Sequence, residues 1–536
     1  MLADEIERVD TALADHPEAP YYLGYQAVDH RGYRLTARNG AIAGENDSHW
    51  RAADVDLRVG SPELDSTHEI RDGSWMAEEM REQAVLPLDG DPRATRLVLW
   101  RVTDDAWRSA RRRLTQVEAN EQVKVDRQGG LADFTAVPVV EHIEEPLPLV
   151  VADDWKPRLR EVSTVFIDHP DLHLSTVTLD VETELSLHAT SEGARIQSAR
   201  RWYRVSLSAG TVADDGMQVE LYEAFDAADE AGLPSQEALL AAAEELAQRV
   251  EALRAAPLLE PFSGPVLLSG RASGVFFHEV FGHRIEGHRQ RSEDEGQTFK
   301  DMVGESILPP FLSVIDDPTR AQVGEVDLRG HYAVDDEGVA AEVVTLVEAG
   351  VLRTFLMSRR PIEGLAVSNG HGRREPGNTV VPRQGNLVVE TTRGLDDAAL
   401  RSALLAEIDA QDKPYGLYVG DITGGFTLTG RVLPNSFNVR AVEVWRVYAD
   451  GRPDELVRGG DLIGTPIATF SRILASGDTP EVFNGTCGAE SGWVPVSAVS
   501  PPMLVGELEV QRKEIENDLP PLLPQPMPRA ASSVTP

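Results

Sequence analysis

The chain has 536 residues and a formal net charge of −37, which results from 88 Asp and Glu against 51 Lys and Arg. Its length exceeds that of one ordinary hydrophobic core, so two or three domains are expected. The strong negative charge argues against general binding to nucleic acids or anionic membranes, because such binding needs clustered Lys and Arg.

The first half of the chain alternates helical and strand patterns. Apolar residues at helical spacing predict helices over residues 2–14, 74–84, 104–122 and 235–255. Other runs, mostly with alternating apolar and polar residues, predict strands over residues 95–102, 162–168, 172–189 and 199–212. The stretch RAAPLLEPFSGP, which ends at Pro265, follows the last of these helices, and we interpret it as a domain boundary.

The second half has more strand patterns and more glycine turns. Hairpins are predicted with turns at Ala349-Gly350 and at Asp450-Gly451, and further strands over GNLVVE and GGFTLTG. Only two helices are predicted here, one carrying a histidine cluster and one over residues 395–409. The tail from Leu519 is rich in proline and is expected to be unpacked.

Together these patterns predict an α+β protein. We expect a mixed helix and antiparallel-sheet N-terminal domain over residues 1–258. A mainly antiparallel β C-terminal domain over residues 259–518 would carry the histidine-bearing helix, and residues 519–536 would form the tail.

The cellular compartment is indicated by the start of the chain and by its cysteine content. The opening residues MLADEIERVD are acidic and amphipathic, without the basic start and apolar core of a secretory signal. No apolar run approaches the ~20 residues needed to cross a bilayer. The single cysteine, Cys487, allows no intramolecular disulfide bond. We therefore expect a cytoplasmic protein with no nucleic-acid and no membrane partner.

The histidine cluster lies in the stretch SGVFFHEVFGHRIEGHRQ. Its first two histidines, His278 and His283, are five residues apart, whereas the common zinc-peptidase signature places them four apart. Ser273 predicts an N-cap, with the helix running from Val275. Five residues of regular α-helix would turn the two rings roughly 140° apart. We therefore predict that the helix widens or breaks near Gly282, so that both rings meet one metal ion.

Such a site would suit catalytic zinc. Neutral imidazoles bind zinc well, and a catalytic zinc usually has three protein ligands and one water molecule. Glu279 would take a proton from that water and deliver it to the leaving amine. Candidates for the third ligand are Cys487, His288 and Glu286, and the spacing does not choose between the cysteine and His288.

Two other functions fit the same residues. Cys487 could be the nucleophile of a cysteine hydrolase, with His278 or His283 as its base, but this leaves the intervening glutamate and one histidine without a role. Alternatively, a non-catalytic binding subunit could keep a structural zinc. Such a site would need a fourth protein ligand, from His288 or Glu286.

Several motifs of the second half, in the same order, resemble the TldD/PmbA family of metallopeptidases, also called modulators of DNA gyrase. The resemblance covers most of the chain from Pro265 to Leu508, whereas the N-terminal half is similar mainly in its alternation of elements. The matching motifs are GPVLLSGRASGVFFHEVFGHRIEGH, HYAVDDEGVAAEVVTLVEAGVLRTFLMSR, SNGHGRREPGNTVVPRQGNL and the late strands from Gly424.

The resemblance implies the active TldD type, because the chain keeps His278, Glu279 and His283, which belong to a motif that the PmbA/TldE type lacks. It also implies that Cys487 is the third zinc ligand and that the five-residue spacing is native to the site. One Zn²⁺ would be bound per chain.

The resemblance further implies cleavage of unfolded or flexible peptides and peptide precursors by a homodimer, or by a heterodimer with a PmbA/TldE-type subunit. The substrate would lie extended and pair with a strand edge near the zinc. Arg373, Arg374 and Arg383 are expected to contact substrate carbonyls or its terminal carboxylate. A direct role in gyrase binding gains no support from the composition.

Overall fold

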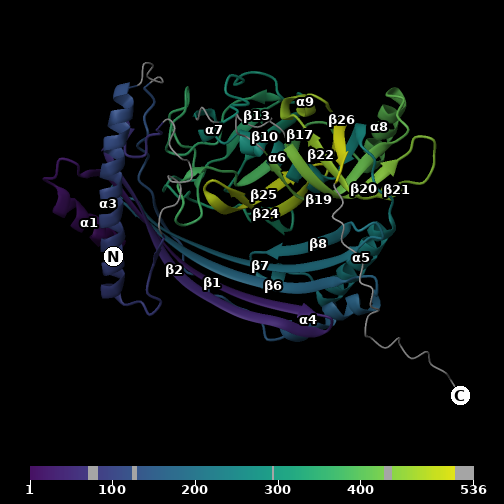
Figure 1. Cartoon of the computed structure of the whole chain (residues 1–536), viewed down its shortest axis with the longest axis horizontal. Helices are drawn as coiled ribbons and strands as arrows, with labels where there is room; N and C mark the ends of the chain where they lie inside the picture. The colour runs from purple at the N-terminus through teal and green to yellow at the C-terminus, as the bar shows by residue number, and fades with distance from the viewer. Residues whose placement is uncertain (71–82, 124–129, 292–294, 428–436, 514–536) are drawn as a thin grey trace.

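The computed structural model describes residues 1–70, 83–123, 130–291, 295–427 and 437–513. Figure 1 shows two layers, with the curved sheet of the N-terminal half lying beneath the sheets and helices of the C-terminal half. The α+β class and the largely antiparallel sheets agree with the sequence prediction. Within the described residues, no helix is both long and apolar enough to span a bilayer.

The N-terminal layer is one sheet in which the structure describes eight strands. Their spatial order is β3-β2-β1-β6-β7-β5, with β4 paired to β2 and β8 paired to β7. The four long strands are β1 (Pro20–Arg38), β2 (Ala41–Ser61), β6 (Leu174–Thr190) and β7 (Arg195–Val212). The shorter ones are β3 (Leu64–Asp65), β4 (Ala84–Val85), β5 (Glu141–Ile143) and β8 (Gln218–Ala227).

Helices cover the outer face of this sheet. They are α1 (Leu2–Leu13), α3 (Pro92–Val123), α4 (Trp155–Thr164) and α5 (Gln236–Ala255), with short 3-10 turns η1 (Val165–Asp168) and η2 (Glu230–Gly232). Alternate side chains of β6 and β7, such as Leu179 and Val205, are fully buried in the core shared with α4 and α5. Successive side chains of a strand point to opposite faces of the sheet, so a sheet with one apolar face shows this alternation of buried and less buried residues.

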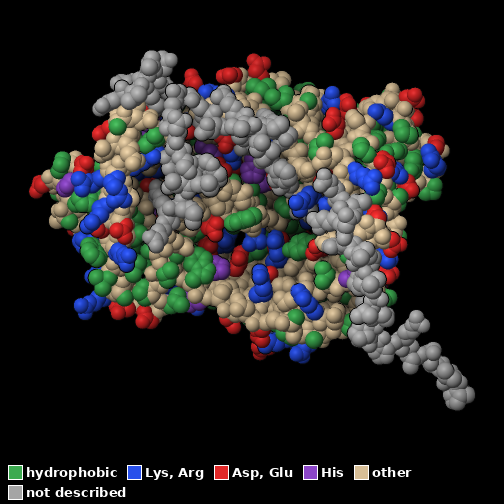
Figure 2. Space-filling view, in the orientation of Figure 1, with side chains coloured by type: hydrophobic (Ala, Val, Ile, Leu, Met, Phe, Trp, Pro, Cys, Tyr) green, Lys and Arg blue, Asp and Glu red, His purple; other side chains and the backbone are tan. Residues whose placement is uncertain are grey.

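The opposite face of the sheet is polar and looks toward the C-terminal layer. In the space-filling view, charged side chains gather along the band between the two layers (Figure 2). Arg204 of β7 donates to the backbone oxygen of Asn484 at 3.2 Å, and Arg329 donates to Glu182 of β6 at 2.8 Å. Polar contacts of this kind, from both layers, therefore help to join the two halves.

The C-terminal layer contains two larger sheets. The first has the order β14-β13-β10-β17-β25-β24, and the second has the order β18-β23-β26-β22-β20-β19-β9, with β21 on β20. An additional pairing of β26 with β9 closes β9, β19, β20, β22 and β26 into a barrel. Two short hairpins, β11 with β12 and β15 with β16, lie outside these sheets.

The strands of the first sheet are β10 (Leu312–Asp316), β13 (Val344–Glu348), β14 (Val351–Leu352), β17 (Asn386–Thr391), β24 (Glu481–Ala489) and β25 (Gly492–Ser500). Those of the second are β9 (Phe262–Leu268), β18 (Gly394–Leu395), β19 (Gly416–Thr427), β20 (Phe437–Val447), β21 (Glu455–Val457), β22 (Gly460–Gly464), β23 (Ile473–Gly477) and β26 (Met503–Arg512). The short hairpins are β11 (Gln322–Val323) with β12 (Val326–Asp327) and β15 (Gly372–Arg373) with β16 (Val381–Pro382).

Helix α6 (Gly270–Val280) runs through the middle of this layer. Its apolar side chains belong to the largest core cluster, together with residues of both sheets. The other helical segments here are η3 (Gly282–Arg284), α7 (His288–Arg291), α8 (Asp397–Ala410) and α9 (Pro466–Phe470). Because most of α6 is buried between the two sheets, both sheets help to fix the position of the helix.

Most of the predicted elements are confirmed, with two clear errors. The predicted strand over residues 95–102 belongs to α3, which begins at Pro92 and continues through the predicted helix 104–122. The predicted strand over residues 162–168 is the end of α4 followed by η1. Short apolar runs fit both kinds of element, and here they form helices that pack on the sheet.

Some predictions lie partly or wholly outside the described residues. Of the expected helix 74–84, only the last two residues are described, and Ala84 begins β4. The end of GGFTLTG and the tail 519–536 are not among the described residues. Both predicted hairpins are present, and Ala349 and Gly350 have the positive φ angles of 47° and 82° that a tight two-residue turn requires. The division at residue 258 stays a proposal.

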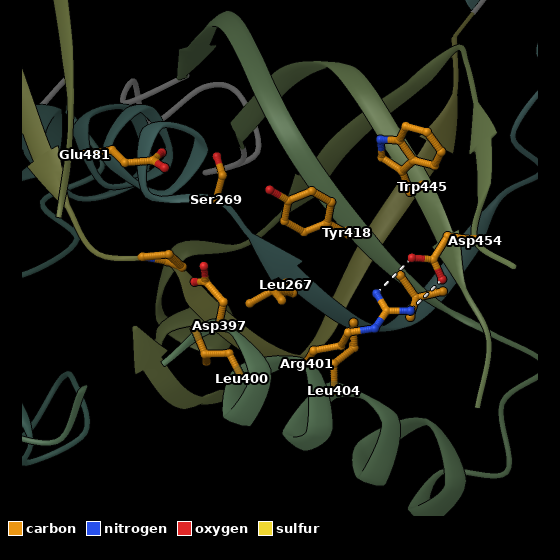
Figure 3. A pocket seen from close by; sticks show the side chains of 12 residues that line it. Leu267, Ser269, Asp397, Leu400, Arg401, Leu404, Tyr418, Trp445, Asp454 and Glu481 are labelled. Carbon is orange, nitrogen blue, oxygen red and sulfur yellow. Dashed lines mark hydrogen bonds and ion pairs between the residues drawn. The ribbon is translucent and has the colours of Figure 1, made fainter. Parts of the chain in front are cut away.

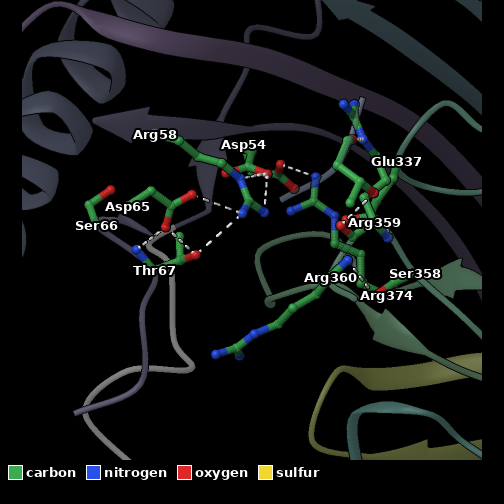
Figure 4. A network of polar contacts seen from close by, with 12 residues as sticks. Asp54, Arg58, Asp65, Ser66, Thr67, Glu337, Ser358, Arg359, Arg360 and Arg374 are labelled. Carbon is green, nitrogen blue, oxygen red and sulfur yellow. Dashed lines mark hydrogen bonds and ion pairs between the residues drawn. The ribbon is translucent and has the colours of Figure 1, made fainter. Parts of the chain in front are cut away.

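A buried polar network joins the two layers near the start of β15 (Figure 4). Arg374 donates to Asp54 of β2 and, at 2.8 Å, to the side-chain oxygen of Gln26 in β1. Arg359 makes two hydrogen bonds to Glu192 at 2.7 and 2.8 Å. The side chains of Asp54 and Arg374 are only 1% and 3% exposed. A buried charge is costly without a partner, so each of these two charges helps to stabilise the other.

We predict that Arg374→Ala lowers the free energy of unfolding by about 3–5 kcal/mol, because it leaves the buried Asp54 carboxylate without its cation. Urea denaturation would measure this loss. Arg452→Ala is the matched control, since Arg452 pairs with Asp450 at a site where both side chains are more than half exposed. It should cost less than about 1 kcal/mol. Equal losses in the two variants would contradict the structural role of Arg374.

Candidate metal centre

Helix α6 starts one turn earlier than the sequence suggested. The N-cap is Ser269, whose hydroxyl oxygen accepts the backbone N–H of Ala272 at 3.0 Å, and not Ser273. Ser273 is buried and hydrogen-bonded to Ser500 at 2.9 Å. A Cβ on Gly274 would lie 3.2 Å from the backbone oxygen of Ala498, so this glycine lets α6 approach β25 closely. Helix α6 is therefore seated directly on the sheet that carries Cys487.

The helix ends between the two histidines. The last bond of α6 runs from the N–H of Phe281 to the oxygen of Phe277, and the following bond, from Arg284 to Phe281, is of the tighter 3-10 type. The N–H of Ile285 is then shared between the oxygens of Phe281 and Gly282, at 3.2 Å each. The helix thus breaks and tightens, so the predicted break is confirmed and the widened turn is wrong. A Cβ on Gly282 would collide with the side-chain amide of Gln384, so a larger residue here would have to displace that side chain.

Because of this break, His278 and His283 face one another, with ring centroids 5.1 Å apart. Cys487 reaches them from β24, 204 residues further along the chain than His283. Its sulfur lies 3.2 Å from Nε2 of His278 and 3.4 Å from Nε2 of His283. The ligand atoms of the three residues lie within 4.8 Å of one another, and all three residues are buried, at 5, 6 and 7% exposure.

This arrangement suits a zinc ion. A tetrahedral site with Zn–S of ~2.3 Å and Zn–N of ~2.0 Å separates sulfur from nitrogen by roughly 3.5 Å. The two observed sulfur–nitrogen distances are close to this value. Two imidazoles and one thiolate leave one coordination position for water, as in catalytic zinc sites.

The electrostatics of the group favour a metal-binding thiolate. Burial raises the pKa of the Cys487 thiol, but the neighbouring His283 and His278 outweigh it and hold that pKa well below its usual value. Burial lowers the pKa of His283, but Cys487 and Glu286 raise it well above the usual value. The surroundings of Cys487 thus favour its thiolate form, which is the form that binds a metal ion.

Glu279 follows His278 directly and lies at the edge of this group. One of its carboxylate oxygens is 3.9 Å from Nε2 of His283, the nitrogen that faces Cys487. Its side chain is 12% exposed, so it lies at the margin of the buried cluster. A carboxylate in this position can reach a water molecule that shares the cluster with the three ligand residues.

Comparison with known proteins shows which protein family the C-terminal half resembles. Residues 262–512, which contain all four of these residues, match a model described as the PmbA/TldA metallopeptidase C-terminal domain. The C-terminal half of the chain therefore carries a domain of the TldD/PmbA family.

Relatives in the TldD/PmbA family match only part of this chain. A protein named metalloprotease TldD homolog from Haemophilus influenzae is 27% identical over 250 residues, or 46% of this chain and 48% of that protein. A protein named metalloprotease from Archaeoglobus fulgidus is 30% identical over 291 residues, or 54% and 60%. The chain therefore spans between about half and three fifths of the length of these relatives.

Solved structures resemble nearly the whole chain. TldE from Thermococcus kodakarensis has a TM-score of 0.63 and 13% identity, over 95% of this chain and 99% of that one. A protein from Thermotoga maritima, described as a modulator of a DNA gyrase, has a TM-score of 0.61 and 15% identity, over 95% and 100%. At these identities the similarity shows the fold alone.

Within this TldD/PmbA-family domain, Glu286 lies behind a histidine and not among the ligand atoms. Its carboxylate is 3.4 Å from Nδ1 of His283, on the side of the ring away from Cys487. Burial raises the pKa of Glu286, but His283 and Arg289 bring it down to about 2, so it is ionised. A carboxylate bonded to the far nitrogen keeps Nε2 free to bind a metal, which is a common arrangement at zinc sites.

His288 is also outside the ligand group. It pairs with Glu490, a residue that the sequence did not single out although it lies three positions after Cys487. Glu286, His288 and Glu490 form a second cluster of possible ligands. Arg289 donates to both carboxylates at 3.0 Å, so their charge is already neutralised by a protein cation.

The three arginines predicted to contact substrate are buried instead. Arg383 donates to the backbone oxygen of Cys487 at 2.8 Å and to Ser491 at 2.9 Å. Arg373 donates to the backbone oxygen of Gln384 at 2.7 Å, and Arg374 binds the N-terminal sheet as described above. Their exposures of 1 to 7% and their protein partners favour structural roles, and the expected contact with substrate stays a prediction.

We predict that Gly282→Ala weakens zinc binding at least tenfold, because the new methyl group would displace Gln384 or the turn that carries His283. Isothermal titration of the metal-free protein with zinc would measure this. Gly282→Ala combined with Gln384→Ala should recover part of the affinity, since it removes the colliding side chain. Gly44→Ala is the control, because no atom lies within 4 Å of its Cβ. Unchanged affinity in Gly282→Ala would contradict this account of the break.

Proposed function

We propose that this chain is a zinc-dependent metallopeptidase of the TldD type that hydrolyses unfolded or flexible peptides. The observation that carries the proposal is the buried group of His278, His283 and Cys487 with Glu279 at its edge. The family description and the names of the relatives, which are metalloproteases, support the same reaction class.

Each residue of the site then has a distinct task. His278, His283 and Cys487 would hold one Zn²⁺, and Glu286 would hold the proton on Nδ1 of His283 so that Nε2 stays free. When bound, zinc would lower the pKa of a coordinated water molecule and polarise the peptide carbonyl group. Glu279 would accept the proton of the attacking water and deliver it to the nitrogen of the leaving amine.

We place an extended substrate at the edge of the first C-terminal sheet, where the backbone oxygen of Asn484 already accepts a hydrogen bond from Arg204 and other backbone groups would pair with the peptide. Strand β24 carries Cys487 and is the last strand in the order of that sheet, pairing with β25 alone among the described strands. A peptide that adds to this edge would be held mainly by backbone hydrogen bonds. Such binding accepts many side chains but needs an unfolded chain, which fits the proposed substrate class.

The cysteine-hydrolase alternative draws support from one observation. The thiol of Cys487 has a lowered pKa and lies 3.2 Å from Nε2 of His278, as a thiolate nucleophile and its base would. The sulfur, however, lies beside two imidazoles and is 7% exposed, which suits a ligand better than a nucleophile. A structural zinc is disfavoured because no fourth ligand among the described residues joins the group.

The assembly and location follow as further parts of the proposal. We propose that the protein works in the cytoplasm, either as a homodimer or with a PmbA/TldE-type subunit. The structural similarity to TldE is consistent with such a partner, since related folds often assemble through equivalent surfaces. Residues 1–258 would form a separate N-terminal domain.

We predict one zinc per chain in the purified protein, measured by mass spectrometry of the released metal. Cys487→Ser and His283→Ala should each lose most of it, because two remaining ligands bind zinc weakly. His288→Ala is the matched control and should keep its zinc, since His288 pairs with Glu490 outside the ligand group. Full retention of zinc in Cys487→Ser and His283→Ala together would refute the ligand assignment.

We predict that Glu279→Gln keeps zinc yet cleaves an unstructured fluorogenic peptide about 10²–10⁴-fold more slowly, because an amide cannot accept the proton. Glu260→Gln, at a side chain that is 66% exposed, is the control and should cleave normally. In the wild type, a zinc chelator should stop cleavage and thiol alkylation of the zinc-loaded protein should not. The reverse pattern would favour the cysteine hydrolase.

A further inference from the structure

A cavity of about 560 Å³ lies in the C-terminal layer, by the N-terminal end of α6 (Figure 3). The metal centre is at the other end of this helix. Helix α8 forms one side of the cavity, and strands β9, β19 and β20 form the other. Leu267, Leu400 and Leu404 give it an apolar floor that belongs to the core cluster beneath α8.

Two aromatic side chains stand on the strand side of the cavity. Tyr418 of β19 and Trp445 of β20 are directly opposite one another in the antiparallel pair, so their side chains lie on the same face. Figure 3 shows both rings facing the space above α8. No Lys or Arg of the described residues lies over either ring, although aromatic faces attract cations.

The polar lining of the cavity is negative. It includes the carboxylates of Asp397, Asp454 and Glu481 and a single cation, Arg401. Arg401 is neutralised by Asp454 through two hydrogen bonds of 2.8 Å (Figure 3). Neither Asp397 nor Glu481 forms an ion pair with a described residue, and Glu481 only accepts the backbone N–H of Arg271 at 2.6 Å.

These features select an organic cation over a metal ion. A divalent metal needs several oxygen ligands close together, and the carboxylates of this cavity are not among the grouped possible ligands of the described residues. A lysine or arginine side chain needs an apolar channel for its methylene groups and a carboxylate or aromatic face for its charged end. The cavity offers both.

We propose that this cavity is a secondary substrate site that binds a lysine or arginine side chain of the peptide being cleaved. The inference rests on the proposed peptidase function, because it assigns the cavity to the same substrate. Backbone pairing at β24 would accept peptides of many sequences. The cavity would add a preference for a basic residue at one fixed distance from the bond that is cleaved.

That distance follows from the elements that connect the two sites. Ser269, which lines the cavity, precedes His278 by nine residues of α6, or about 14 Å at 1.5 Å per residue. Glu481 precedes Cys487 by six residues of β24, or about 20 Å. An extended peptide at about 3.3 Å per residue covers these lengths in about four to six residues.

The test uses unstructured peptides that share one cleavable core and carry lysine, arginine or norleucine about four, five or six residues from the bond cleaved, on each side in turn. The wild type should cleave the best basic peptide with about fivefold higher kcat/KM than its norleucine counterpart, mainly through KM. Asp397→Asn and Trp445→Leu should each bring the ratio of kcat/KM between the basic and the norleucine peptide closer to one. Asp409→Asn, an exposed aspartate at the far end of α8, should retain it.

A binding measurement separates this inference from the peptidase proposal. Fluorescence anisotropy with a labelled lysine peptide and the Glu279→Gln protein reports binding without cleavage. Weaker binding on Asp397→Asn, for the lysine peptide but not the norleucine peptide, would support the site even if no peptide were cleaved. Cleavage with equal kcat/KM for basic and norleucine peptides at every position would overturn the site and leave the peptidase proposal intact.

Discussion

The site depends on the end of one helix. If α6 continued as a regular helix through Gly282, the rings of His278 and His283 would point in different directions and could not share an ion. The helix ends instead at Val280 and turns tightly, at a glycine against which Gln384 packs. The five-residue spacing of the histidines therefore follows from the backbone geometry, and it is not a faulty version of the four-residue spacing.

The remaining ligand residue comes from a different part of the fold. Cys487 is fixed by the pairing of β24 with β25, and α6 packs on that sheet because Gly270 and Gly274 allow close approach. The group is thus assembled from two elements that only the folded core brings together. Binding of an ion to such a group stabilises the folded state, because the unfolded chain does not present the same ligand set.

Much of this could be predicted from sequence because it is local. The amphipathic pattern of α5 and the alternation of β6 and β7 agree with the structure, as does the expectation of a break between the histidines. The start of α3 was misread because Leu97, Val98 and Leu99 are consecutive apolar residues, a pattern that fits a strand as well as a helix. Strands β1 and β2 were not predicted, because residues 22–28 and 52–55 are buried on both faces of the sheet and show no simple alternation.

Other features depend on tertiary contacts that leave no local pattern. Nothing near Gln384 or Glu490 in the sequence relates them to the histidines, because each reaches the site through a different loop or hairpin. Ser269 and Ser273 are equally good caps by residue type, and the packing of α6 decides between them. The three motif arginines look like solvated loop residues until the fold shows that they are buried.

The pairing of β26 with β9 has a consequence for how the protein matures. The barrel joins residue 262 at one end to residue 510 at the other, so it cannot close until nearly all of this stretch has left the ribosome. Cys487 also emerges late. A nascent chain therefore cannot bring Cys487 to His278 and His283 until late in translation.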